Sequence, residues 1–104
     1  MENLSFVFPA TRAAGGSKSL AIIGVVASGN LEALFERTED NTACRIEIST
    51  AAHGFQPLWE AVLHDFVAKG AGGLRISIND GGARPDMVAL RLAQGLRLIE
   101  DAEA

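Results

Sequence analysis

The stretch IIGVVASGNLEALFER, from Ile22 to Arg37, contains two apolar runs separated by the dipeptide Gly29-Asn30. Glycine readily adopts the positive φ that the first central position of a type II′ turn requires, so this pattern predicts a tight β-hairpin. A two-residue loop places Ser28 opposite Leu31, with the hydroxyl of Ser28 exposed at the hairpin tip. The same register gives two further pairs, Val26 with Ala33 and Gly24 with Phe35.

The composition is that of a globular protein, with 48% hydrophobic and 21% charged residues. A chain of 104 residues predicts a single domain over residues 1–104, because chains divide into several domains only well above about 150 residues. The net charge is −4 and the nine Lys and Arg residues form no run, which argues against a nucleic-acid-binding protein.

The distribution of apolar residues and cysteine indicates a cellular compartment. No apolar run approaches the roughly 20 residues that a membrane span needs. The single cysteine, Cys44, excludes an intramolecular disulfide, and no charged-then-apolar leader precedes the first strand pattern. We therefore expect a cytoplasmic protein with no membrane partner.

Period-two alternation predicts further strands on both sides of the hairpin, over 4–8, 44–50 and 74–79. Two amphipathic patterns predict helices, one beginning near Pro57 and closing at Lys69-Gly70, the other running from Pro85 to Glu100. Residues 10–18 are expected to form a flexible connection. The predicted fold is α+β, a two-layer sandwich in which a mainly antiparallel sheet of about five strands carries both helices on one face.

Each predicted helix has an apolar stripe. The first stripe consists of Leu58, Val62 and Phe66, widened by Trp59, Leu63 and Val67. The second consists of Val88, Leu92, Leu96 and Ile99. Gly95 lies in the middle of the second helix, where glycine costs about 1 kcal/mol relative to alanine, which suggests close packing against a strand or a partner.

A search for catalytic chemistry finds no complete set of residues. One cysteine and two histidines, Cys44, His53 and His64, are too few ligands, in different predicted elements, to indicate a tetrahedral metal site. Cys44 fits a buried core thiol better than a nucleophile. His64 and Asp65 are adjacent on the polar side of a helix, where they cannot face each other. Ala27-Ser28-Gly29 is not a Gly-x-Ser-x-Gly elbow. No catalytic residue is therefore predicted.

The segment from Asp80 to Pro85, DGGARP, leaves two interpretations open. Its glycine pair is compatible with a backbone cradle for an anion, but it lacks the Lys-Ser/Thr of a Walker loop. A turn that leads into a helix with Pro85 in its first turn is favoured. Arg84, Arg91 and Arg97 are expected on a solvated or partner-facing edge of that helix.

Three segments together resemble a known family. They are Val26–Leu34 (VASGNLEAL), the N-terminal Leu4–Pro9 (LSFVFP) and Asn79–Pro85 (NDGGARP) leading into Val88–Leu92 (VALRL). In this order, over nearly the full chain, they look like the acyl carrier (delta) subunit of bacterial malonate decarboxylase. The related citrate lyase acyl carrier is a second match, but the C-terminal segments are more similar to the malonate enzyme.

The resemblance implies a carrier function for Ser28. In the family this serine carries a covalent 2′-(5″-phosphoribosyl)-3′-dephospho-CoA group through a phosphodiester, and its thiol holds malonyl and acetyl thioesters. The chain itself would be non-catalytic. The implied partners are the transferase and decarboxylase subunits, a malonyl transferase and a prosthetic-group transferase; no nucleic acid or membrane is implied.

The chain departs from the family pattern at two positions beside Ser28. Ala27 replaces a glycine and adds only a methyl group, whereas Asn30 replaces an aspartate and removes a negative charge. Neither change removes the anchoring hydroxyl. Two other functions stay open on the residues alone, a non-carrier interaction module and, least supported, a small stand-alone enzyme.

Overall fold

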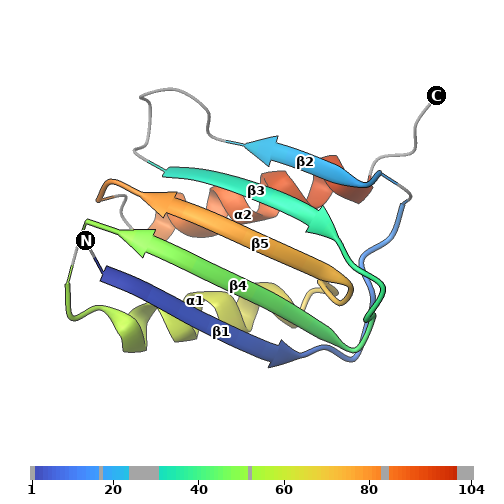
Figure 1. The fold of residues 1–104 in the computed structure, drawn as a ribbon, viewed down its shortest axis with the longest axis horizontal. Helices are drawn as coiled ribbons and strands as arrows, with labels where there is room; N and C mark the ends of the chain where they lie inside the picture. The colour runs from blue at the N-terminus through green and yellow to red at the C-terminus, as the bar shows by residue number, and fades with distance from the viewer. Residues whose placement is uncertain (1, 17, 24–30, 52, 83–84, 101–104) are drawn as a thin grey trace.

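The computed structural model describes residues 2–16, 18–23, 31–51, 53–82 and 85–100, and within these ranges it contains five strands and two helices (Figure 1). In chain order they are β1 (Glu2–Pro9), β2 (Leu20–Ile23), β3 (Leu31–Arg37), β4 (Ala43–Thr50), α1 (Gln56–Val67), β5 (Leu74–Asp80) and α2 (Pro85–Glu100).

All five strands join one sheet in the order β1-β4-β5-β3-β2. Only the β4–β5 pair is parallel among the described strands, because α1 carries the chain back to the starting end of the sheet between them. The other neighbouring strands are antiparallel. The predicted α+β class and mainly antiparallel sheet are confirmed.

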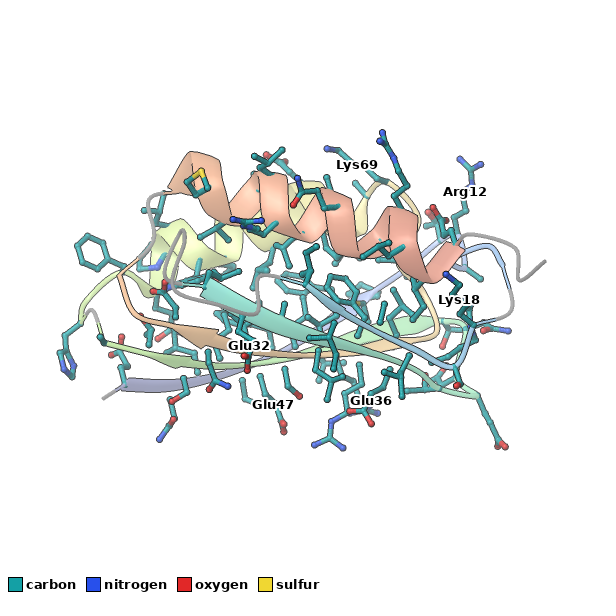
Figure 2. The ribbon with its side chains drawn as sticks, turned by 90° about the horizontal axis from the view of Figure 1, so that it is seen from above. Arg12, Lys18, Glu32, Glu36, Glu47 and Lys69 are labelled. Carbon is teal, nitrogen blue, oxygen red and sulfur yellow. The ribbon has the colours of Figure 1, made fainter. Side chains whose placement is uncertain are left out.

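Both helices lie against the same face of the sheet, which we call the covered face (Figure 2). In Figure 1, α1 lies behind β4 and β1, while α2 lies behind the β3–β2 half. Alternate strand residues point into the layer between sheet and helices and form the core. The largest fully buried side chains on the strands are Leu31, Phe35, Ile46, Leu74, Ile76 and Ile78.

The opposite face, which we call the open face, is not covered by any described element. Its residues are the other members of each alternation, and Figure 2 shows Glu32, Glu36 and Glu47 pointing away from the helices. Exposed apolar side chains also occur here, including Val7, Leu20 and Ile22. The two-layer arrangement with both helices on one face is therefore confirmed.

The apolar stripe of α2 is as predicted, because all four of its members are buried. Gly95 packs against a strand, since a Cβ at this position would overlap the ring of Phe35 on β3. The stripe of α1 is only partly as predicted. Trp59 and Leu63 are buried with Phe66, but Leu58 is 42% exposed.

The predicted register of the hairpin is wrong. β2 and β3 are antiparallel neighbours, but Phe35 pairs with Ala21 and Ala33 pairs with Ile23. This register turns Ala21 towards the covered face, where β2 contacts α2, and leaves Ile22 exposed on the open face. A shift of the register by an odd number of residues moves every side chain of a strand to the other face. We therefore attribute the observed register to packing under α2, not to the turn pattern in the sequence.

The described part of the predicted flexible connection, residues 10–16 and 18, makes specific contacts with the rest of the fold. Ala13 forms a parallel bridge with Gly72, and Ala14 is buried. The guanidinium of Arg37, at the end of β3, donates hydrogen bonds to four backbone carbonyls. The acceptors are Ala14 O (3.2 Å), Gly15 O (2.9 Å), Lys18 O (2.8 Å) and Ile99 O (2.9 Å).

Candidate functional site

The candidate carrier residue, Ser28, lies outside the described residues, as does the predicted Gly29-Asn30 turn. The structure does define where the segment that contains Ser28 leaves the sheet. β2 ends at Ile23 and β3 begins at Leu31, and Ser28 is the middle residue of the sequence between the paired Ile23 and Ala33. The segment therefore joins two strands at one edge of the sheet.

Leu31 belongs to a row of paired residues at this end of the sheet. It pairs with Asp80 on β5, which pairs with Thr50 on β4, which pairs with Glu2 on β1. Both helices begin at the same end, because α1 follows β4 and α2 follows β5. We call this the segment end of the molecule, because the segment that contains Ser28 joins β3 here.

A buried polar contact stabilises the segment end. The hydroxyl of Thr50 donates to Asp80 Oδ2 at 2.7 Å, and the backbone N–H of Gly82 donates to Asp80 Oδ1 at 3.1 Å. Thr50 is fully buried and Asp80 is 4% exposed. Because a buried carboxylate is costly unless it accepts hydrogen bonds, these contacts fix the end of β5 beside the first residue of β3.

The sequence did not identify this polar pair, although a signal was present. Asp80 was assigned to a turn, whereas β5 includes it. Thr50 follows the inward-facing Ile48 by two residues, and Asp80 follows the inward-facing Ile78 by two residues, so both are at inward positions of their strands. A polar residue at an inward position predicts a buried polar partner, and the two residues are in register.

The other candidate residues are not assembled into a site. His53, His64 and Asp65 are exposed, and the ring of His64 lies edge-on to Phe8 with centroids 6.5 Å apart. Within the described ranges, no three His, Cys, Asp or Glu side chains gather as metal ligands do. α2 begins at Pro85, as predicted, whereas the predicted turn is only partly described, because Ala83 and Arg84 lie outside the described residues.

Cys44 is a core thiol, as predicted. It is fully buried on the covered face of β4, and burial raises the pKa of its thiol to about 12. A thiol with that pKa carries almost no thiolate at neutral pH, and the thiolate is the reactive form. Cys44 therefore contributes to packing and is unsuited to nucleophilic chemistry.

The open face carries a shallow hollow near the segment end. Nine residues of β1, β4 and β5 line it. Three of them, Leu4, Ile48 and Ile78, point inward to the core. The small and polar side chains on the open face are those of Asn3, Ser5, Glu47, Ser49, Ser77 and Asn79. Glu47 also pairs with Arg75 (Oε2 to NH2, 3.0 Å), and both side chains are about half exposed. We call this feature the open-face hollow.

Comparisons with known proteins agree on one family. The family model described as malonate decarboxylase delta subunit (MdcD) matches residues 18–99. Neither described helix is long and apolar enough to cross a membrane.

Two full-length relatives are named malonate decarboxylase acyl carrier protein. The one from Bradyrhizobium diazoefficiens is 55% identical over 97% of both chains. The one from Xanthomonas euvesicatoria pv. vesicatoria is 50% identical over the whole of both chains. A chain in the crystal structure of a Pseudomonas malonate decarboxylase hetero-tetramer in complex with malonate is 37% identical, with a TM-score of 0.80 over 95% of this chain and 99% of that one.

Proposed function

The chain belongs to the delta-subunit family of malonate decarboxylase, the acyl carrier proteins of that enzyme, and we propose that Ser28 is its point of covalent modification. The proposed group is 2′-(5″-phosphoribosyl)-3′-dephospho-CoA, attached through a phosphodiester to the serine hydroxyl. Residues 1–104 then act as one non-catalytic acyl-carrier domain.

The observation that carries this proposal is the position of Ser28 in the sheet connection. Ser28 is the middle residue between the paired Ile23 and Ala33. The connection is bounded on one side by β3, whose inward residues are buried, and on the other by β2, where Ala21 is buried and Ile23 is partly buried. Leu31 is next to the hydrogen-bonded Asp80. A carrier needs such a rigid base, because a fixed origin determines which partner sites the arm can reach.

The described residues offer a surface that suits the tethered arm. The open-face hollow near the segment end offers the hydroxyl and carboxamide groups that suit an amide-rich arm. When bound, the group supplies a thiol that holds malonyl and acetyl residues as thioesters. The protein holds the origin of the arm, and tethering raises the local concentration of the thiol to about millimolar at each partner site.

The proposed partners perform the chemistry. They are the transferase and decarboxylase subunits of malonate decarboxylase, a malonyl transferase, and the prosthetic-group transferase that modifies Ser28. The likeness to a chain of the Pseudomonas hetero-tetramer supports an assembly of this kind. We further propose that it works in the cytoplasm, where a lone cysteine stays reduced.

Intact-mass spectrometry tests the modification. The chain is co-expressed with the prosthetic-group enzymes of the family, and the wild-type protein should gain the mass of one phosphoribosyl-dephospho-CoA group. Ser28→Ala should gain none, whereas the control Ser19→Ala, which removes an exposed hydroxyl just before β2, should be modified like the wild type.

Two results would contradict the proposal. Wild-type protein that stays unmodified under these conditions would favour a non-carrier interaction module. Modification of the Ser28→Ala chain would show that the group is attached to another residue, and fragmentation of the modified peptide would identify that residue.

A further inference from the structure

The open-face hollow lies within reach of a group tethered to the segment that contains Ser28. Its row Asn3, Ser49 and Asn79 continues in register to Glu32, the residue after the start of β3. Because neighbouring strands lie about 4.8 Å apart, β4 in the middle of the hollow is roughly 10 Å across the sheet from β3. An extended coenzyme-A-like arm is longer than that distance.

We propose that the open-face hollow is a resting site for the tethered arm and that it holds the uncharged, amide-bearing pantetheine part of the arm. This inference rests on the proposed function, because it requires an arm attached near this end of the sheet. All residues that line the proposed site belong to the described strands β1, β4 and β5.

The lining supplies the hydrogen-bonding groups that such a chain needs. Two carboxamides and three hydroxyls face the hollow, and carboxamides both donate to and accept from amide groups. In the part of the chain that the structure describes, the side chains of Asn3, Ser5, Ser77 and Asn79 form no hydrogen bond with another residue. Their polar groups therefore remain open to water or to a ligand.

Charge and size determine which part of the arm fits. Ser5 and Ser77 lie on either side of Glu47 in one row, and their small side chains leave room over the sheet. Glu47 and the neighbouring Glu32 repel the phosphates of the arm, although Arg75 partly neutralises Glu47. The pantetheine chain itself is uncharged and avoids this repulsion, whereas the phosphodiester at the anchor and the diphosphate between adenosine and pantetheine do not.

Tethering makes a shallow site sufficient. A tethered group has an effective concentration of about millimolar, so a site with a dissociation constant of roughly 1 mM is about half occupied. Weak binding also suits a carrier, because the arm must leave the hollow to enter the active site of a partner. The arm can therefore rest in the hollow between transfers and still dissociate for the next transfer.

NMR spectroscopy of the full chain tests the proposal, after intact mass has shown whether the arm is present. Amide signals of the six lining residues on the open face, and side-chain amide signals of Asn3 and Asn79, should differ between the apo and modified protein. Free dephospho-CoA titrated at millimolar concentration into Ser28→Ala should shift the same signals. The double variant Ser5→Val/Ser77→Val fills the hollow with residues that strands favour.

In the double variant, the free probe should bind about tenfold more weakly, as expected for one or two lost hydrogen bonds. The control Val7→Thr, exposed on the same face but outside the hollow, should behave like the wild type. Signal changes confined to helix residues, or equal binding to the filled variant, would overturn the proposal. A chain that is never modified contradicts the proposed function instead, and the titration then still tests the hollow.

Discussion

The covered and open faces of the sheet differ most clearly at two successive residues of β3. Phe35 is fully buried under α2, where its ring fills the space left by Gly95. Leu34 points to the other side and is only partly buried, between Ser77 and Ile22 in the sheet. The same strand therefore stabilises the fold mainly through one face, while its other face is not covered by a described helix.

The largest expected effect is on the covered face. Phe35→Ala should lower the free energy of unfolding by about 3–5 kcal/mol, because it opens a cavity under α2. Leu34→Ala is the matched control and should cost clearly less than Phe35→Ala, because Leu34 is only partly buried and its truncation leaves no enclosed cavity. Urea denaturation measures both, and similar losses would contradict the difference between the faces.

A smaller loss is expected where β3 ends. Arg37→Met keeps an apolar stem but removes the donors to four carbonyls. We expect a loss of about 2 kcal/mol, less than the summed hydrogen bonds, because water replaces part of them. Amide hydrogen exchange should accelerate at residues 13–16; Arg45→Met, on the open face, is the control and should leave these rates unchanged.

The free energy of unfolding should depend on pH through Cys44, which is buried on the covered face. Burial raises the pKa of its thiol from 9.0 to about 12, so the unfolded chain loses this proton at lower pH than the folded chain. The contribution of Cys44 to stability is therefore complete below about pH 9 and declines by at most about 1.4 kcal/mol per pH unit as the pH rises towards 12. The stability difference between wild type and Cys44→Ala should shrink over this range; a constant difference would show that the thiol is not buried in solution.

The smallest effect is expected at the ion pair of the open face. Glu47 and Arg75 are about half exposed, and water and salt screen such pairs. Glu47→Gln should change stability less than any variant above, and the change should vanish at high salt. A loss that persists at high salt would mean that Glu47 has a structural role beyond the pair.

Local periodicity predicted much of the fold. The alternation in β4 correctly placed Cys44 inward and Arg45 outward, and α2 begins at Pro85 and ends at Glu100 as predicted. These features depend on residues close in sequence. The family and the carrier role came from resemblance, and the attachment at Ser28 stays a prediction.

The features that the sequence missed depend on residues far apart in the chain. The register of β2 follows from the narrow space under α2, where Ala21 fits beside Phe35. The buried Asp80 accepts a hydrogen bond from Thr50 of another strand, and Arg37 donates one to Ile99 at the end of α2. No short window contains both members of such a pair, so local patterns cannot predict them.

The contacts of Arg37 also bear on how the chain folds while it is being synthesised. Three of its acceptors, in Ala14, Gly15 and Lys18, precede β3 and leave the ribosome before it. The fourth, in Ile99, emerges only after nearly all of α2 has been made. A nascent chain can therefore order its early loop around the guanidinium, but the loop and the helix are joined only when α2 docks. Translation that stops before Ile99 leaves this junction incomplete, and such a chain exposes the apolar layer to chaperones and proteases.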